Sequence, residues 1–330
     1  MKIIVDAFGG DNAPLEIIKG CADAVKSLDI DILLTGREPE IRSTAEKNEI
    51  SLERMEIVDV PGVVTMEDSP GEIMRSKKDS SMAEGLRLLA EGKGDAFLSA
   101  GNSGALVVGT SLIVKRIKGI KRVAFAPVMP KKSGFFMLID CGANVDCRPE
   151  MLQQFGVMGS IYMEKVMNIE KPRVALANIG TEEHKGGELQ HGAFELLKES
   201  PVNFVGNIEA RDISNDGADV VVSDGFTGNI ILKMFEGVAI MLMGKFKEIL
   251  TKSSKNKLAA GILMKDIVAL KKSMDYNEYG GAPIMGAAKP VFKVHGSARA
   301  KTVESALRLT KAYVAGNVID EISRSVSELS

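Results

Sequence analysis

The sequence contains no tryptophan, and aromatic residues make up only 5% of its 330 residues. Its three cysteines, Cys21, Cys141 and Cys147, form no C-x-x-C motif, and the three histidines add no zinc-ligand spacing. So few cysteines exclude a disulfide-rich secreted scaffold. We therefore expect a reducing, cytosolic location, no bound metal, and only an incidental part for Cys141 and Cys147 in any chemistry.

The chain also lacks a strong net charge and a targeting segment. Its formal net charge of −2 gives no reason to expect a nucleic-acid partner. The amino terminus "MKIIVDAFGG" leads directly into a predicted strand, without the apolar core of a signal peptide. No apolar run comes near the roughly 18 residues that a membrane span requires, so we expect no transmembrane helix.

Two nucleotide-binding signatures are missing as well. No G-x-G-x-x-G follows a predicted strand, and no G-x-x-x-x-G-K-[ST] occurs anywhere. We therefore expect no nucleotide cofactor of the Rossmann or Walker type, and no cofactor of another kind is indicated.

Glycine, in contrast, is abundant, with 33 residues, and the chain repeats a unit of apolar strand, glycine turn and amphipathic helix. Strands are predicted at residues 2–7, 95–100, 135–140, 173–180, 202–207, 220–222 and 290–295. This alternation predicts a three-layer αβα fold with a mostly parallel sheet. Ligands of such sheets lie beyond the carboxyl ends of the strands, where the glycine turns collect.

Two of these turns share the pattern S-x-G-x-[ST]-G, "SAGNSG" at 99–104 and "SDGFTG" at 223–228. Each offers backbone N–H groups and a hydroxyl at the start of a helix, which suits a small anion. Glycine turns also recur in α/β folds without any ligand, and this alternative stays open. The candidate anion-binding residues are Gly101, Asn102, Ser103, Gly104, Gly225, Thr227 and Gly228.

Residues from about 230 to 276 break the rhythm, because they form two long apolar helices joined by "TKSSKN". Their apolar content exceeds what one face of a single domain needs. We expect a protruding helical hairpin that pairs with a second copy in a homodimer. Leu258, Ile262 and Leu263 lie among lysines near its tip, which also suits an anionic membrane surface.

A series of motifs occurs in order from Asp6 to Ser297: "DAFGGDNAP", "SAGNSGAL", "DCGANVDCRPE", "NIGTEEHKG", "GNIEARD", "SDGFTGN", "YGGA" and "HGS". The set closely resembles the PlsX family, the bacterial acyl-ACP:phosphate acyltransferases of phospholipid synthesis. Mild departures from the family's usual residues stand at Phe8, Asn12, Ser103 and Cys141. The resemblance implies one catalytic unit over residues 1–330, with a fold similar to isocitrate/isopropylmalate dehydrogenases and phosphotransacetylases.

The resemblance also implies the reaction: a long-chain fatty acyl group passes from acyl carrier protein to inorganic phosphate, giving acyl phosphate. Phosphate is itself the nucleophile, so the protein has to position it and stabilise the tetrahedral oxyanion. The implied partners are acyl carrier protein, phosphate, a second copy of the chain, a membrane glycerol-3-phosphate acyltransferase, and the anionic inner face of the cell membrane.

Lys185 and Asn229 are the catalytic residues that the resemblance implies. Lys185, in "GTEEHKGGE", would hold phosphate or move its proton, and Asn229 would donate its amide to phosphate or the oxyanion. A solvated loop lysine and an ordinary helix-start residue are the simpler alternatives, and His184 is a weaker candidate base. Candidate supporting residues at the sheet edge are Asp6, Asp11, Asp140, Asn144, Arg211, Asp224 and His295.

An acidic carrier protein requires a basic docking surface despite the near-neutral total charge. Two basic runs are candidates, although such runs are usually solvated: Arg75, Lys77 and Lys78, and the run that begins with Lys115 and Arg116.

Three other functions stay open. A phosphotransacetylase-like enzyme would use the same turns with a short acyl-CoA donor. A metal- and NAD-dependent decarboxylating dehydrogenase would use Asp212 and Asp216 as ligands. A membrane-associated scaffold of lipid synthesis would need no catalysis at all.

Overall fold

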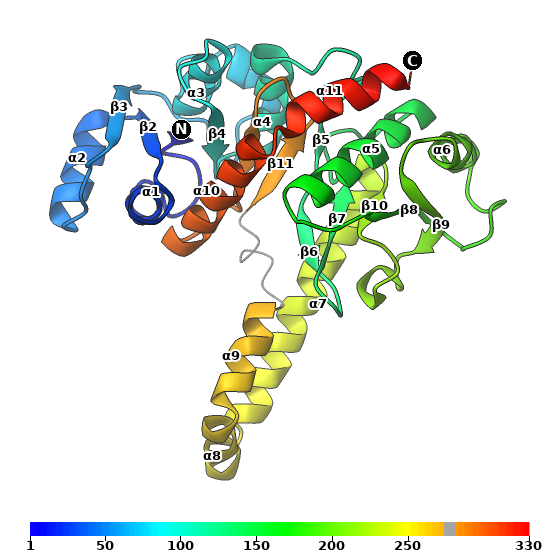
Figure 1. Cartoon of the computed structure of the whole chain (residues 1–330). Helices are drawn as coiled ribbons and strands as arrows, with labels where there is room; N and C mark the ends of the chain where they lie inside the picture. Colours follow the sequence, from blue (N-terminus) through cyan, green and yellow to red (C-terminus); the bar gives the residue numbers. More distant parts are fainter. Residues whose placement is uncertain (274–280, 330) are drawn as a thin grey trace.

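The computed structural model describes residues 1–273 and 281–329, and its strands divide between two sheets (Figure 1). The first sheet has the order β3-β2-β1-β4-β12-β11-β5. Its strands are β1 (Lys2–Asp6), β2 (Asp31–Gly36), β3 (Met55–Asp59), β4 (Ala96–Ser99), β5 (Ala124–Phe125), β11 (Ala282–Met285) and β12 (Val291–Lys293). The pairs from β3 through β12 are parallel, whereas β11 runs antiparallel to both of its neighbours.

The second sheet has the order β6-β7-β10-β8-β9. Its strands are β6 (Val128–Pro130), β7 (Phe135–Ile139), β8 (Arg173–Asn178), β9 (Asn203–Glu209) and β10 (Val220–Val222). All pairs are parallel except β6 with β7. The predicted α/β class with mostly parallel strands is therefore confirmed, and the division into two sheets is an addition to it.

Helices follow the strands as the repeated unit predicts. They are α1 (Leu15–Leu28), α2 (Glu38–Lys47), α3 (Ser81–Ala90), α4 (Ser103–Gly109), α5 (Pro149–Lys165), α6 (Glu188–Lys198), α10 (Ala300–Ala315) and α11 (Val318–Glu328), with the short 3-10 helices η1 (Pro70–Met74) and η3 (Ile213–Asn215) and the π-helix η2 (Thr110–Val114). The amphipathic spacing of residues 301–323 predicts one helix, but the segment forms two, α10 and α11, because Asn317 adopts a left-handed φ of 50°.

One apolar core joins the two sheets. Ile3 and Val5 of β1 belong to the same buried cluster as Val220 and Val222 of β10. Because the core is continuous, the carboxyl ends of strands from both sheets are held in a fixed arrangement, and the space between them forms the cleft described below.

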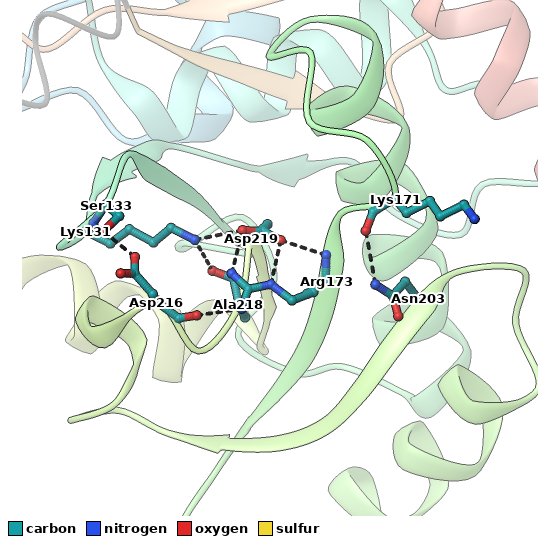
Figure 2. Close-up of polar contacts among 8 residues, drawn as sticks. All are labelled: Lys131, Ser133, Lys171, Arg173, Asn203, Asp216, Ala218 and Asp219. Atoms are coloured by element: carbon teal, nitrogen blue, oxygen red, sulfur yellow. Dashed lines mark hydrogen bonds and ion pairs between the residues drawn. The ribbon is translucent and has the colours of Figure 1, made fainter.

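A partly buried ion cluster secures the amino ends of β8 and β10 (Figure 2). The Lys131 Nζ donates to Asp219 Oδ1 over 2.7 Å, and Arg173 donates to both oxygens of the same carboxylate over 3.0 Å. Burial disfavours the ionised Asp219, but the hydrogen bonds from Arg173 and Lys131 outweigh it and hold its pKa well below the usual range. The cluster lies at the strand ends opposite the candidate ligand edge.

The predicted hairpin projects away from the sheets (Figure 1). Its first arm, which leads away from the sheets, is α7 (Gly225–Thr251). Its second arm, which leads back, consists of α8 (Ser254–Ile262) and α9 (Met264–Ser273). Apolar side chains remain exposed along it, including Ile240 at 75%, Leu258 at 71% and Ile262 at 79%. Residues 274–276, the expected end of the hairpin, lie outside the described residues, as does part of the "YGGA" motif.

The expectation of no apolar run of membrane-span length is wrong for α7. This helix is long and apolar enough to cross a membrane by length and composition, with a mean hydropathy of 1.4 over its best window, of which 11% is buried. Charged residues such as Lys233 and Glu236 are too few to interrupt it. Length and composition alone are weak evidence, since core helices of soluble proteins pass the same criterion.

Candidate active site

Two adjoining cavities form a cleft between the sheets. The first cavity, of about 260 Å³, is lined among others by Asp11, Met129 and His295, and the second, of about 380 Å³, by Gly142 and Asn229. Residues that line both cavities are Ser103, Phe125, Leu232 and Lys233. The carboxyl ends of β4, β7, β10 and β12 supply these walls, so the cleft lies where parallel sheets place their ligands.

Asp6 anchors the first glycine turn from below. Its carboxylate accepts hydrogen bonds from Ser81 Oγ and Ser99 Oγ, each over 2.7 Å, and Ser99 Oγ accepts one from the Gly101 backbone N–H over 3.0 Å. Burial raises the pKa of Asp6, although these hydrogen bonds oppose the shift. Asp6 therefore supports the turn rather than lining the cleft.

Asn102 fixes the turn at the start of α4. Its Oδ1 accepts from the Ala105 N–H over 3.0 Å, and its Nδ2 donates to the carbonyls of Thr65 and Asp68 over 3.1 and 3.0 Å. The next residue, Ser103, is exposed to both cavities, and its hydroxyl makes no hydrogen bond within the described residues. The first turn thus presents a hydroxyl that is available to a ligand.

The second glycine turn is closed on itself. Asp224 accepts hydrogen bonds from the Thr227 N–H and the Thr227 hydroxyl, each over 2.8 Å, which caps α7. A Cβ on Gly228 would lie 1.9 Å from the Asp140 carbonyl oxygen, so only glycine fits there. Close packing and capping therefore account for this turn without a bound anion, and its residues line neither cavity.

Asp140 organises the loop that faces Asn229. Its carboxylate accepts from the backbone N–H groups of Phe125, Ala143 and Asn144 and from the Asn144 side-chain amide, over 2.7 to 3.1 Å. Burial raises the pKa of this carboxyl, against the hydrogen bonds. The fixed loop and the exposed Asn229 both line the second cavity.

Lys185 lies on the loop between β8 and α6, at the same end of the second sheet as Asn229, but it does not line either cavity. Its backbone carbonyl accepts a hydrogen bond from Asn178 Nδ2 over 3.0 Å, and the adjacent His184 is exposed. Arg211 is also outside the cleft, since its side chain is 78% exposed and pairs with Glu209 over 2.6 Å. The structure therefore brings Asn229 and Ser103 together but not Lys185.

Two lysines of the cleft escaped the sequence analysis. Lys233 lies one turn beyond Asn229 on α7 and pairs with Glu236 over 2.9 Å. Lys293 lies within β12 and is only 5% exposed. A signal for Lys293 was present, because a lysine interrupts the apolar strand "PVFKVH" at a position whose neighbours are buried.

The two basic runs follow helices that lie next to each other: the first run follows η1, and the second follows α4 and η2. Packing of η1 across α4 brings Pro70 against Gly104 and Ile73 against Gly109, and η2 then leads directly into Lys115. Arg75 and Lys78 are exposed. Residues of the runs already engaged within the chain are Lys77, which pairs with Asp68 over 3.1 Å, and Arg116, which donates to the Lys121 carbonyl over 2.6 Å.

The described residues offer neither a reactive cysteine thiolate nor a cluster of metal ligands. Burial raises the pKa of the Cys141 thiol well above its usual value and that of Cys147 to about 11, which disfavours the reactive thiolate. Among residues 1–273 and 281–329, no group of three or more His, Cys, Asp or Glu side chains could hold a metal ion. Asp216 accepts a hydrogen bond from the Ser133 N–H over 3.0 Å, and Asp212 lies 3.5 Å from Arg211.

The fold is that of the phosphotransacetylases. The EutD phosphotransacetylase from Staphylococcus aureus matches 95% of this chain and 94% of its own, with a TM-score of 0.62 and 16% identity. A phosphotransacetylase from Streptococcus pyogenes also gives a TM-score of 0.62, at 17% identity, over 96% of this chain and 94% of its own. At such identities the likeness concerns the fold alone.

Sequence comparison defines the family more closely. Residues 1–321 match the family described as "Fatty acid synthesis protein". The phosphate acyltransferase of Alkaliphilus oremlandii is 47% identical over 329 residues, covering 100% of this chain and 98% of its own, and that of Clostridium acetobutylicum is 45% identical over 331 residues, covering 100% of both. The chain belongs to this family, the PlsX phosphate acyltransferases, and the predicted family, fold class and enzymatic nature are confirmed.

Proposed function

We propose that this phosphate acyltransferase takes a long-chain fatty acyl group from acyl carrier protein, and that the acceptor phosphate binds in the cleft between the sheets. One observation carries the proposal: Ser103 and Lys233 line both cavities, so a polar anion site and an apolar chamber share one wall. A phosphate and an acyl thioester held in the two cavities would meet at that wall.

The first cavity suits the acyl chain. Pro127, Val128, Met129 and Leu232 line it, and Val128 and Met129 are buried, at 3% and 1% exposure. Each methylene transferred from water to such walls contributes about 0.8 kcal/mol. A chamber of this kind favours a long acyl chain over the acetyl group of a short acyl-CoA.

The second cavity suits phosphate. The Ser103 hydroxyl, the Asn229 amide and the Lys233 ammonium group supply donors there. A phosphate oxygen attacks the thioester carbonyl carbon, the new C–O bond forms a tetrahedral oxyanion, and the C–S bond then breaks. The proton of hydrogen phosphate passes to the departing thiolate, so acyl phosphate and the carrier thiol are the products. One positioned donor to such an oxyanion contributes about 3 kcal/mol.

Among the remaining candidate residues, Lys185 keeps its proposed part, whereas the second glycine turn is proposed to position Asn229 rather than to bind phosphate itself. Lys185 stays a proposed catalytic residue on the strength of its motif, with the difference that its loop would have to approach the bound substrate. Gly225, Thr227 and Gly228 would support phosphate binding by fixing Asn229 on the first turn of α7. The exposed Arg75, Lys78 and Lys115 would dock the acidic carrier beside α4.

We further propose that the hairpin pairs across a two-fold axis in a homodimer and that its tip contacts anionic lipid. The enzyme would then be cytoplasmic and peripheral at the inner face of the membrane, near a membrane glycerol-3-phosphate acyltransferase. Support comes from the exposed Leu258 and Ile262 at the tip and from the apolar side chains exposed along α7.

The donor is tested with purified protein, inorganic phosphate and either a long-chain acyl carrier protein or an acyl-CoA, without added metal or nucleotide. We expect acyl phosphate from the acyl carrier protein. Faster turnover of acetyl-CoA would identify the phosphotransacetylase-like alternative, and absence of product from every donor would favour a scaffold.

The hairpin is tested with anionic vesicles. Leu258→Glu combined with Ile262→Glu is expected to abolish vesicle sedimentation while soluble activity is retained, whereas Val205→Glu, an exposed apolar position on β9, is the control. Vesicle binding unchanged in the double variant excludes the tip as the contact. A wild-type monomer by light scattering excludes the dimer.

A further inference from the structure

Lys293 occupies an unusual position for a lysine. It is the last residue of β12, which pairs with β4 inside the first sheet, and the residue is only 5% exposed although it lines the first cavity. An ammonium group so buried loses most of its hydration, so it requires strong partners within the protein or in a ligand.

The partners that the protein supplies are neutral. The Lys293 Nζ donates to the carbonyl of Ala100, over 3.2 Å, and to the carbonyl of Val294. Within the described residues it forms no ion pair; Asp6 and Asp11 act on it only from a distance. Ala100 belongs to the first glycine turn, so the same contact ties the ammonium group to the turn that presents Ser103.

Among the described residues, the other ionisable groups that face the first cavity do not form an ion pair with the Lys293 ammonium group. Lys233 is paired with Glu236, so together they add little net charge. His295 has its pKa lowered, mainly by burial and further by Lys293, which favours the neutral ring near pH 7. Asp11 supplies one negative charge at the cavity wall, opposite in sign to Lys293. The cleft therefore holds a buried cation without a carboxylate in contact.

We propose that Lys293 is a further catalytic residue, whose protonated amine binds the inorganic phosphate at the wall shared with Ser103. This inference rests on the proposed function of the cleft and names the group that holds its nucleophile. A dianionic phosphate would supply the partner that the protein withholds, and binding it beside Ser103 would place an oxygen next to the acyl chamber. Burial also lowers the pKa of Lys293 to about 8. A phosphate bound beside the amine would favour its protonated form, because the two charges are opposite in sign.

The test begins with phosphate binding, measured by isothermal titration calorimetry on the full-length protein, because it needs no acyl donor. Lys293→Met is expected to weaken phosphate binding at least tenfold, and Lys293→Arg to retain part of it. The matched control is Lys131→Met, which removes a lysine whose side chain is only 4% exposed from the opposite end of the second sheet. Unchanged phosphate affinity in Lys293→Met overturns the proposal, even if the carrier protein is the wrong donor.

A pH series separates binding by the charge from a structural part for the side chain. Wild-type phosphate affinity is expected to fall about tenfold for each pH unit above about 8, where Lys293 loses its proton. Phosphate itself is already mostly dianionic there, with a second pKa of roughly 6 to 7. In Lys293→Arg the affinity should stay flat to pH 10, since arginine remains protonated. A wild-type affinity that does not fall between pH 8 and 10 also overturns the proposal.

In the acyl-transfer assay, Lys293→Met should raise the KM for phosphate at least tenfold with a smaller change in kcat. Inactive wild-type protein would reject the donor in the proposed function and leave the calorimetric result to decide about Lys293. An unchanged KM for phosphate in the active variant counts against the lysine alone.

Discussion

The two glycine turns look alike in sequence and differ in what they leave free. In "SAGNSG" the capping residue is Asn102, and the hydroxyl of Ser103 stays open to the cleft. In "SDGFTG" the capping residue is Asp224, which takes both the N–H and the hydroxyl of Thr227. A shared turn pattern thus fixes a helix start in both places, while the identity of the capping residue decides whether a donor remains for a ligand.

The largest effect is expected from Gly228→Ala. The added Cβ would stand 1.9 Å from the Asp140 carbonyl oxygen, so backbone must move at the contact between two turns. We expect the free energy of unfolding to fall by about 3 kcal/mol, at the upper end for overpacking. Chemical denaturation measures it, and Gly237→Ala on α7, where a Cβ meets nothing within 4 Å, is the matched control. Equal stability of the two variants would contradict the close packing.

Loss of a catalytic donor should come next. Asn229→Ala is expected to lower turnover at least about tenfold without unfolding, consistent with removal of one positioned amide. Lys185→Ala is expected to do the same if its loop reaches the substrate. Steady-state kinetics at saturating phosphate decide both, and near-normal turnover in either variant removes that residue from the catalytic set.

Removing the hydroxyl of each turn, at Ser103 and at Thr227, should have different effects on activity and stability. Ser103→Ala should lower kcat/KM for phosphate roughly tenfold with an unchanged melting temperature, because it removes a free donor of the cleft. Thr227→Ala should leave kcat/KM nearly unchanged and lower stability by about 1 kcal/mol, because it removes a capping contact. The opposite pattern would mean that the second turn, and not the first, holds the anion.

The smallest effects are expected at the thiols. Cys141→Ala and Cys147→Ala should stay active, since burial keeps both groups protonated and direct attack by phosphate needs no thiol. Mass spectrometry of protein incubated with the acyl donor provides the check. An acyl group trapped on either cysteine would contradict direct transfer.

Local patterns carried most of the fold and part of the site. Strands at apolar runs such as 2–7 and 220–222 could be predicted, because a run of consecutive apolar residues indicates a buried strand by itself. The separation into two sheets depends on distant pairing, such as Ile284 with Phe125, which no local pattern records.

The positions of the site residues were harder to predict, because they also depend on contacts between distant segments. The path of the loop that carries Lys185 is set by contacts such as the one with Asn178, so motif spacing could not place it relative to the cleft. Lys293 was overlooked because lysine is ordinarily a surface residue. The capping of Thr227 by Asp224, in contrast, could have been anticipated, since an aspartate at a helix start favours that bond.

The central claim is that phosphate binds in the cleft beside the first turn. A crystal structure of the protein with inorganic phosphate tests it most directly. The account predicts phosphate within hydrogen-bond distance of Ser103 Oγ, of Lys293 Nζ, and of the Asn229 or Lys233 side chain. Phosphate bound instead at the turn from Asp224 to Gly228, or beside Lys185 and away from Ser103, would contradict it.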